Sequence, residues 1–592
     1  MGSVSVRTRR VVAVALALAV GFGWMAPTGT PAQAQARGLT GGGRALVVVS
    51  HPLAAEAGAE MLRRGGNAVD AAAAVQFALN VVEPQFSGIG GGGFLMLYLA
   101  STGQTIALDG REMAPAADTP DQFLGPDGKP LPFAQAHVQG TAVGVPGTLL
   151  NVATALERYG TTPLADTMQP AIDLAQNGFR INRFLASDIA DAKAKLATWP
   201  ATAAVFLPNG QPLAESAMLR QPDLAKTLRL IQQQGPSVLY QGEVGQALVA
   251  AQAQRSGRIA MADLASYEVK VRDPIVGTYR GYTVMSMAPP SSGGLIMTQM
   301  LEMLEPLDLR SKGQNTPEAL HPMIEAMHLA YADRGKYMGD TDFVEVPMVG
   351  LLSPEYVATR RALIDPAQAN PSVQPGDPWA YEAGAPTVYA DVPSEEGTHT
   401  THFTIVDGAG NIVAYTTTIE QAWGTGMMVP AYGFLLNNEM TDFDFVPGGP
   451  NQVAPGKRPR SSMNPTIVFR DGQPVFALGS PGGATIITTV MQVFLNVVEH
   501  QMALQDAIDA PRIFSSSYPS VTWEEGLDPA TLDALTALGH KPAAMPTVIG
   551  SVQAALRGPD GQWMGGADHR REGTVIYVEQ PLAPVPAGAT GK

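Results

Sequence analysis

The chain has 592 residues, of which 45% are hydrophobic and 15% are charged, with a formal net charge of -15 at pH 7 and no cysteine. The lack of cysteine excludes disulfides, a thiolate nucleophile and cysteine-ligated zinc or iron–sulfur sites, so nucleophilic chemistry must use Ser, Thr, Lys or a carboxylate. The acidic balance argues against nucleic acid or an anionic membrane surface as a partner and leaves small polar substrates open. The length allows several average domains or one large α/β or α+β body.

The first residues have the pattern of a targeting signal. Three arginines within the first ten residues precede the apolar run Val11–Phe22, and Ala34-Gln35-Ala36 supplies a small-x-small cleavage site. We therefore predict a signal peptide over residues 1–36 and an exported protein, periplasmic or secreted. A permanent membrane anchor is the alternative, but the apolar run is shorter than a spanning helix needs. The Arg9-Arg10 pair also resembles part of a twin-arginine signal, without the rest of that motif.

A short apolar strand, Leu46–Val49, is predicted next, followed by helices Pro52–Arg64 and Ala68–Val82. The glycine-rich stretch Ser87–Gly93 matches the G-x-G-x-x-G pattern of dinucleotide sites. It follows a helix and opens the strand Phe94–Tyr98, however, whereas the nucleotide-binding motif follows a strand and opens a helix. We therefore interpret these glycines as positions of close backbone packing.

The middle of the chain, residues 141–350, is predicted to be largely helical. One well-capped helix, which begins at Thr316, carries three potential metal ligands, His321, Glu325 and His328. The two histidines are two helical turns apart, too far for both rings to reach one ion as an i, i+4 pair would. We therefore predict no metal site on this helix.

Two thirds of the way along the chain, a polar stretch turns abruptly into a predicted hairpin over residues 403–418, which is rich in β-branched residues. The preceding connector, Pro386–His399, is expected to be exposed and open to cleavage. If the His399–Thr400 bond were cut, Thr400 would carry both a hydroxyl nucleophile and an α-amine able to act as its base. Hairpin chemistry alone does not choose Thr400 over its threonine neighbours, and an uncut threonine-rich hairpin fits equally well.

The C-terminal third has a further hairpin signal at Asp471-Gly472, after which Ser480–Gly483 leads directly into an apolar helix, Thr485–Val498. Two adjacent glycines at a helix start expose backbone N–H groups at the positive end of the helix dipole. This turn could form an oxyanion hole. The structural alternative is a tight connection between a strand and a helix.

Two polar clusters and one arginine complete the candidate residues. Carboxylates such as Glu439 and Asp442 can hold an ammonium group, and the hydroxyls of Ser461 and Ser462, with an arginine such as Arg111, can hold a carboxylate. An α-amino acid head group carries both charges. Each cluster taken separately also fits a solvated loop.

The combination of motifs resembles the γ-glutamyltranspeptidase family over essentially the whole chain after the signal. The motifs that carry the resemblance are, in chain order, His51–Ala55, Gly65–Ala72, Gly110-Arg111-Glu112, Thr400–Phe403, Gly424-Thr425-Gly426, Leu435–Phe443, Lys457–Pro459 with Ser461–Met463, and Gly479–Gly483. The resemblance implies an α+β, N-terminal-nucleophile hydrolase fold, an αββα sandwich of two antiparallel sheets between helical layers. It also implies self-cleavage into a large segment, residues 37–399, and a small catalytic segment, residues 400–592, which stay together as a heterodimer.

The resemblance further implies a role for each candidate residue, with no metal or organic cofactor. Thr400 would be the nucleophile twice, first on the carbonyl of His399 and then on the substrate. The remaining roles would be a hydrogen bond to the nucleophile from Thr418, oxyanion N–H groups from Gly482 and Gly483, binding of the substrate α-carboxylate by Arg111, Ser461 and Ser462, and binding of its α-ammonium by Glu439 and Asp442.

Two departures from the family pattern affect this site. Glu420 stands where many members have asparagine, so a carboxylate replaces an amide donor near the head group. The chain between Asp442 and Ser461 is also shorter than in members that have a lid over the pocket. We therefore expect an open site that tolerates bulky or polymeric γ-glutamyl substrates.

The predicted activity is transfer of a γ-glutamyl group, from glutathione or another γ-glutamyl compound, to water or to an amino acid or peptide. A γ-glutamyl ester of Thr400 would serve both outcomes. The first alternative is a cephalosporin or glutaryl acylase on the same scaffold, whose substrate lacks part of the amino acid head group. The second is an uncleaved binding protein without activity.

Overall fold

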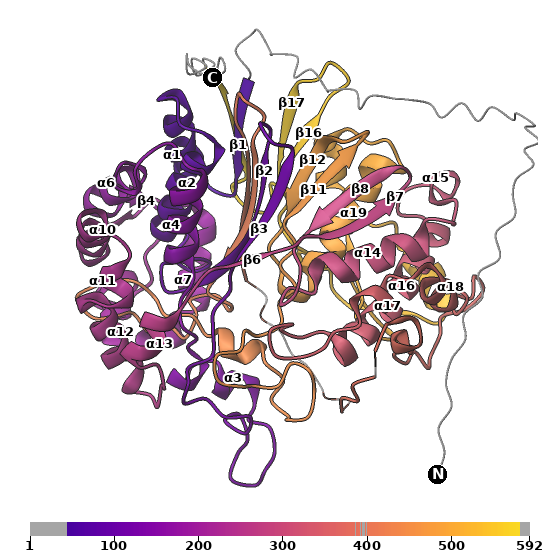
Figure 1. Cartoon of the computed structure of the whole chain (residues 1–592), viewed down its shortest axis with the longest axis horizontal. Coiled ribbons are helices and arrows are strands. Elements are labelled where there is room, and N and C mark those ends of the chain that lie inside the picture. Colours follow the sequence, from indigo (N-terminus) through magenta and orange to yellow (C-terminus); the bar gives the residue numbers. More distant parts are fainter. Residues whose placement is uncertain (1–43, 385, 391, 393–396, 398, 581–592) are drawn as a thin grey trace, which may run out of the picture. The chain divides into compact units, whose positions relative to one another are not determined.

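Two antiparallel sheets stack face to face in the computed structural model, which describes residues 44–384, 386–390, 392, 397 and 399–580 (Figure 1). The first sheet has the strand order β18 (Thr574–Glu579), β1 (Arg44–Val49), β9 (Thr401–Val406), β10 (Ile412–Thr418), β2 (Gly92–Leu99), β3 (Gln104–Gly110) and β6 (Lys270–Arg272). The second has the order β17 (Trp563–Ala567), β16 (Gln553–Arg557), β12 (Gln473–Gly479), β11 (Thr466–Arg470), β8 (Tyr282–Ser286) and β7 (Ile275–Tyr279). The predicted signal peptide lies outside the described residues.

A layer of helices covers the outer face of each sheet, which gives the αββα sandwich expected from the sequence (Figure 1). Against the first sheet lie α1 (Pro52–Arg63), α2 (Ala68–Val82) and α4 (Thr148–Tyr159). Against the second lie α14 (Gly293–Leu304), α19 (Ile486–Val498) and α20 (Leu504–Asp509), and α16 (Pro317–Tyr337) packs on α14. Within the described residues, no helix is long and apolar enough to cross a membrane.

The remaining elements are further helices and two small sheets. The helices are α3 (Phe133–Ala136), α5 (Leu164–Thr167), α6 (Gln169–Asn177), α7 (Arg183–Asp191), α8 (Lys193–Ala197), α9 (Pro200–Phe206), α10 (Pro222–Gln234), α11 (Ser237–Tyr240), α12 (Glu243–Ala253), α13 (Met261–Ser266), α15 (Leu309–Lys312), α17 (Met348–Leu351), α18 (Pro354–Arg361) and α21 (Pro529–Ala537). The small sheets pair β13 (Ile513–Phe514), β14 (Ser520–Trp523) and β15 (Lys541–Pro542), and β4 (Phe179–Arg180) with β5 (Met218–Leu219).

Alternation along the strands of the first sheet divides the apolar side chains between two cores. In β1, Val47 and Val49 point into the core beneath α1, α2 and α4, whereas Leu46 and Val48 point into the core shared with the second sheet. Successive side chains of a strand face opposite sides of a sheet, so a strand buried on both faces needs the continuous apolar run seen in β1. Burial on both faces therefore explains why this run has no polar position after Arg44.

Local signals set the ends of the helices that were predicted from the sequence. Asn67 caps α2 through its Oδ1, which accepts hydrogen bonds from Val69 N at 2.9 Å and Asp70 N at 3.1 Å. Asp70 completes the capping box, because its Oδ2 accepts a hydrogen bond from Asn67 N at 2.7 Å. The predictions of α2 and of the strand β1 are confirmed, and α1 ends one residue earlier than predicted.

The glycine-rich stretch before β2 packs tightly, as the sequence interpretation proposed. A Cβ atom on Gly90 would clash with the carbonyl oxygen of Leu435, and one on Gly91 would clash with the carbonyl oxygen of Thr418. Glycine is required there because the two backbones approach too closely for any side chain. These contacts fix the end of β10, the strand that carries Thr418.

The connector before β9 differs from its prediction. Residues 386–390 are exposed or half-buried, as expected, but Gly397 and Thr400 are buried. The expectation of an exposed connector is therefore wrong at its C-terminal end. The physical reason is that this end of the connector enters a pocket lined by polar side chains from distant parts of the chain.

Candidate functional site

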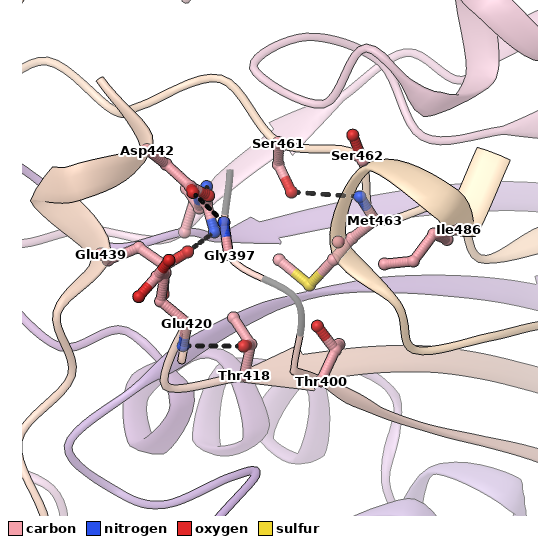
Figure 2. A pocket seen from close by; sticks show the side chains of 12 residues that line it. Gly397, Thr400, Thr418, Glu420, Glu439, Asp442, Ser461, Ser462, Met463 and Ile486 are labelled. Atoms are coloured by element: carbon pink, nitrogen blue, oxygen red, sulfur yellow. Dashed lines mark hydrogen bonds and ion pairs between the residues drawn. The ribbon is translucent and has the colours of Figure 1, made fainter. Parts of the chain in front are cut away.

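A pocket at the start of β9 and the end of β10 gathers nearly all the predicted site residues (Figure 2). It is lined by Arg111, Gly397, Thr400, Thr418, Glu420, Glu439, Asp442, Ser461, Ser462, Met463, Gly483 and Ile486. Of the ten predicted residues, only Gly482 is missing from this lining, and it lines the adjoining cavity together with His399. Figure 2 shows Thr400 and Thr418 on one side of the pocket and Glu439 and Asp442 across from them.

Thr418 contacts the peptide bond that is predicted to be cut. Its Oγ1 donates a hydrogen bond to the carbonyl oxygen of His399 at 2.8 Å. Thr418 Oγ1 also accepts a hydrogen bond from Glu420 N at 2.8 Å. The amide fixes the hydroxyl so that its proton points at the carbonyl. In the uncut chain, Thr418 therefore polarises the predicted scissile carbonyl, whereas its predicted hydrogen bond to the nucleophile stays a prediction for the cut form.

Arg571 and Phe86 hold the two residues that flank this bond. Arg571 Nη1 donates a hydrogen bond to the carbonyl oxygen of Thr400 at 2.7 Å. The ring of Phe86 stacks on His399 with centroids 5.8 Å apart, and the Arg571 guanidinium lies 3.8 Å from the Phe86 centroid. Burial, with a smaller effect from Arg571, lowers the pKa of His399 to about 4. His399 is therefore neutral at pH 7. The sequence alone did not identify Phe86 or Arg571 as functional residues.

Arg111 lies at the centre of a buried cluster of charges. It follows β3 and forms ion pairs with Glu439 and, at 2.6 Å, with Asp442. Its Nη2 also donates a hydrogen bond to the carbonyl oxygen of Arg460 at 2.9 Å. The neighbouring Glu112 is fully buried, and burial raises its pKa to about 7. The cluster contains more acidic groups than basic ones, which suits a ligand that brings its own cation.

A single asparagine positions the acidic side of the pocket. Asn437 Nδ2 donates hydrogen bonds to the carbonyl oxygens of Gly90 at 2.7 Å and Gly144 at 2.8 Å. Its Oδ1 accepts a hydrogen bond from Glu439 N at 3.0 Å. The short helix η4 (Glu439–Asp442), which carries both predicted ammonium ligands, is thus tied to the start of β2.

Glu420 faces the same pocket and is buried, with only 3% of its surface exposed to solvent. Neither carboxyl oxygen has a hydrogen-bond partner among the residues that the structure describes. Burial raises the pKa of Glu420 well above its ordinary value, the nearby Asp442 raises it further, and Lys195 opposes both. A buried polar group without a partner is costly, so Glu420 is ready to accept a donor from a ligand.

The two serines form the opposite side of the pocket. Ser461 Oγ accepts a hydrogen bond from Met463 N at 3.1 Å (Figure 2). Ser462 Oγ accepts a hydrogen bond from Arg334 Nη2 at 3.0 Å, and Arg334 Nε donates to Ser292 Oγ at 2.7 Å. Arg334 thus places a positive charge behind the serines, and sequence reasoning did not identify it.

The glycine pair lies in the turn between β12 and α19, as predicted. Gly482 has φ 137° and Gly483 has φ 56°, and both values favour glycine. The short helix η5 (Gly483–Thr485) follows, so the two N–H groups lie at the start of a helical segment that continues into α19. Within the described part of the chain, neither N–H is hydrogen-bonded, so both can donate to a ligand.

The chain itself fills the pocket. Gly397 N donates a hydrogen bond to Asp442 Oδ1 at 3.1 Å, so a backbone amide occupies the place predicted for an ammonium group. The remaining free volume is about 20 Å³, room for about one water molecule. On the His399 side, in contrast, a cavity of about 710 Å³ adjoins the scissile bond.

The loop between Asp442 and Ser461, which the sequence predicts to be too short to form a lid over the pocket, folds back on itself. Asn451 bridges its two ends, since its Nδ2 donates to the carbonyl oxygen of Asp442 at 2.7 Å and its Oδ1 accepts from Arg460 N at 2.8 Å. All of residues 443–460 are described, and none of them lines the pocket. In this uncut chain, Gly397 lines the pocket and this loop does not.

Comparison with known proteins agrees with this geometry. A family model described as Gamma-glutamyltranspeptidase matches residues 54–578. The chain is 46% identical over 537 residues to a glutathione hydrolase proenzyme of Bacillus subtilis strain 168, covering 90% of this chain and 91% of the relative. It is 39% identical over 548 residues to the acylase ACY 1 proenzyme of Pseudomonas sp. strain SE83, covering 92% and 95%.

Among solved structures, the cephalosporin acylase from Bacillus halodurans superposes with a TM-score of 0.80 at 28% identity, covering 94% of this chain and 99% of that one. The predicted N-terminal-nucleophile hydrolase fold is thereby confirmed. The relatives thus include proteins named glutathione hydrolase and proteins named acylase. The family model covers nearly all of the described residues. The chain therefore belongs to the γ-glutamyltranspeptidase family.

Proposed function

We propose that the chain cuts its own His399–Thr400 bond and that the new N-terminal Thr400 then removes γ-glutamyl groups from glutathione and similar compounds. The relatives named glutathione hydrolase proenzyme support both parts of this proposal. The observation that carries it is the position of the uncut chain. Gly397 lies on the predicted ammonium ligand Asp442, while the scissile bond lies between Thr418 and Arg571.

In the first reaction, Thr400 Oγ1 attacks the carbonyl carbon of His399. The C–N bond breaks, the amide nitrogen of Thr400 takes up the hydroxyl proton, and an ester between His399 and Thr400 forms. Thr418 stabilises the negative charge that develops on the carbonyl oxygen, because its hydroxyl already donates to that oxygen at 2.8 Å. Water then hydrolyses the ester, which leaves a free carboxylate on His399 and restores the hydroxyl of Thr400, whose α-amine is already free after the first step.

In the second reaction, the freed α-amine acts as general base for the Thr400 hydroxyl, which attacks the γ-carbonyl of the donor. The N–H groups of Gly482 and Gly483 are positioned to stabilise the oxyanion. Departure of Gly397 would free Asp442 for the amino acid head group. The 710 Å³ cavity beside Gly482 has room for the leaving group and for the acceptor, water or an amine.

The head-group clamp distinguishes this function from that of an acylase. Glu420, Glu439 and Asp442 surround one side of the pocket with carboxylates, which suit the α-ammonium of a γ-glutamyl group. A glutaryl group has the same chain length but no ammonium. It would add no positive charge to a cluster in which one guanidinium, that of Arg111, already pairs with both Glu439 and Asp442, so the excess of buried carboxyl groups would stay uncompensated, which is costly.

The test compares a γ-glutamyl anilide with the matching glutaryl anilide on the purified wild-type protein. We expect kcat/KM for the γ-glutamyl compound to be at least about a hundredfold higher, since buried groups left unpaired cost about 1–3 kcal/mol each. Equal or preferred turnover of the glutaryl compound would establish the acylase alternative. Absence of turnover for both, with an uncut chain, would support a binding protein.

Export completes the proposal. Cleavage after Ala36 would remove the signal peptide, so the large segment would begin at Arg37. The protein would then lie in the periplasm or the medium. The N-terminal sequence of the large fragment from exported protein checks this assignment, and a fragment that retains the apolar run would point to a membrane anchor.

A further inference from the structure

A second cluster of ionisable side chains lies away from the pocket and takes no part in the proposed reactions. His321 and Glu325 come from α16, and His540 comes from the turn between α21 and β15. All three side chains are buried, and each offers one nitrogen or oxygen atom within 4.8 Å of the other two. Helix α16 alone could not form a metal site, but His540, 219 residues further along the chain than His321, supplies the missing second imidazole.

The hydrogen bond of His321 fixes its tautomer. His321 Nε2 lies 2.7 Å from the carbonyl oxygen of Asp365, which can only accept, so this nitrogen carries the proton. The lone pair is therefore on Nδ1, which accepts a hydrogen bond from His540 Nε2 at 2.8 Å, so metal binding requires the proton of His540 to move from Nε2 to its Nδ1. A ring nitrogen that donates to a backbone carbonyl while the other faces inward is the usual arrangement of a metal-binding histidine.

Glu325 is a buried carboxylate with one unsatisfied oxygen. Its Oε2 accepts a hydrogen bond from Asn370 N at 3.0 Å, whereas Oε1 has no hydrogen-bond partner among the described residues. Within the same residues, no lysine or arginine pairs with it, and the nearest ionisable partner is His328 Nδ1 at 3.4 Å. A buried carboxylate needs a counter-charge, so the cluster lacks one cation.

His328 lies beside Glu325 and is held from its other side. Ser515 Oγ donates to the carbonyl oxygen of Ser520 at 2.6 Å, so it accepts from His328 Nε2, also at 2.6 Å. His328 Nε2 therefore carries a proton. Its Nδ1 lies 3.4 Å from Glu325 Oε1, and neither atom has a hydrogen-bond partner among the described residues.

We propose that His321, Glu325 and His540 bind one divalent cation of the zinc type, through His321 Nδ1, one Glu325 oxygen and His540 Nε2. Two imidazoles and one carboxylate, with no thiolate, are a ligand set that zinc accepts in proteins. The two nitrogens must move from 2.8 Å apart to about 3.3 Å, the edge of a tetrahedron with metal–nitrogen bonds of about 2.0 Å. Water can fill the fourth position.

A cavity lies close to the cluster. It has a volume of about 430 Å³ and is lined by His328, Tyr331 and residues 516–518, next to the Ser515 that binds His328. The cavity reaches His328, whose Nδ1 lies 3.4 Å from Glu325, and none of the three proposed ligands lines it.

The bound cation would join distant parts of the chain. It would link α16 to the segment that follows α21, and His321 in turn holds the turn after α18 through Asp365. If the proposed cut after His399 occurs, these are the large and the small segment, and this consequence rests on the proposed function. Binding itself does not, because all three ligands are present in the uncut chain.

The experiment measures zinc on the full-length protein. Purified wild-type protein is stripped with a chelator, dialysed against ZnCl2 at pH 7.5, passed through a desalting column and analysed for metal by mass spectrometry. We expect about one zinc per chain, and a loss of at least tenfold in Glu325→Gln and in His540→Gln. The uncut Thr400→Ala variant should bind the same amount as wild type, which separates metal binding from self-cleavage.

A surface histidine provides the matched control. His569 is exposed and lies 3.0 Å from Asp509, so it resembles an adventitious site, and His569→Gln should keep the full zinc content. Substitution of Co²⁺ gives a second readout, a visible absorption band in wild type that is absent from Glu325→Gln. Less than about a tenth of an equivalent of zinc in wild type would overturn the proposal, as would unchanged binding in both ligand variants.

Discussion

At the scale of single residues, the site is organised around the hydroxyl of Thr418 and the carbonyl of His399, which are 2.8 Å apart. The contact exists before any cut, so the strongest support for self-cleavage is a geometry that the uncut chain already holds. It also gives Thr418 a task that differs from its predicted hydrogen bond to the nucleophile. In the proposed reactions, both tasks would use the same hydroxyl, first for self-cleavage and then for turnover.

Thr418→Val should slow self-cleavage by about a hundredfold to a thousandfold, because it removes one donor from the developing oxyanion and keeps the shape of the side chain. The rate at which the smaller fragment appears on a denaturing gel measures this effect. Thr418→Ser keeps the hydroxyl and should cleave at a rate within about tenfold of wild type. Equal rates for the valine variant and wild type would remove Thr418 from the first reaction.

Glu420 gives the site a dependence on pH. Below its raised pKa the carboxyl is neutral and cannot pair with the ammonium of a donor, so KM should rise as pH falls, with kcat less affected. Glu420→Gln removes a charge-assisted hydrogen bond worth about 1.5–3 kcal/mol, which should raise KM by about tenfold to a hundredfold at the pH where the wild-type KM is lowest. The variant should also lose the part of the pH dependence that Glu420 causes.

The control for this prediction is Glu243→Gln, which removes an exposed carboxylate that accepts a hydrogen bond from Tyr432 at 2.9 Å. Initial rates over a range of donor concentrations and pH values measure both variants. A Glu420→Gln profile that coincides with wild type at every pH would show that Glu420 does not contact the donor.

At the scale of elements, the turn between β12 and α19 can be tested against another turn of the same sheet. Gly482 and Gly472 both have positive φ, at 137° and 72°, so alanine is strained at each position. A Cβ atom on Gly472 would meet nothing within 4 Å, whereas one on Gly482 would clash with Thr485 Oγ1. Of the two glycines, only Gly482 lines the cavity that adjoins the scissile bond.

Gly472→Ala and Gly482→Ala should therefore both lose stability, by about 1–2 kcal/mol or more, as measured by thermal unfolding. Turnover should fall by about a hundredfold or more in Gly482→Ala alone, because an oxyanion donor is displaced. If both variants lost turnover equally, the effect would come from stability and the turn would not be an oxyanion hole.

Elements with local signals could be predicted from the sequence. The cap at Asn67 and the apolar run of β1 depend only on neighbouring residues, and both were placed correctly. The family resemblance identified the fold, which the comparisons confirm. It also selected ten residues, nine of which line one pocket.

The parts that could not be predicted depend on contacts between distant residues. The connector was expected to be exposed, because its prolines and glutamates give no sign that Gly397 meets Asp442. Arg571 and Arg334 have the appearance of ordinary surface charges in the sequence, and only the fold brings them to Thr400 and Ser462. No local pattern distinguishes such residues from solvated ones.

At the scale of the whole molecule, the two proposed segments share one sheet. Strand β9, which begins directly after Thr400, pairs with β1 on one side and with β10 on the other. The order of the first sheet thus places β9 and β10, from the small segment, between β1 and β2, from the large one. Separating the segments would expose unpaired strand edges and open both hydrophobic cores.

The two fragments should therefore elute together on gel filtration and separate only when the fold is lost. Urea titration followed by chromatography measures this, with fragment separation expected at the same midpoint as the loss of circular dichroism. Separate elution in native buffer would contradict the shared sheet.

The most direct test of the central claim is the N-terminal sequence of the smaller fragment. The purified protein should give fragments of about 40 and 20 kDa. The smaller fragment should begin at Thr400, and the Thr400→Ala variant should give a single uncut chain with no turnover. A wild-type chain that stays whole, or a smaller fragment that begins at any other residue, would contradict it.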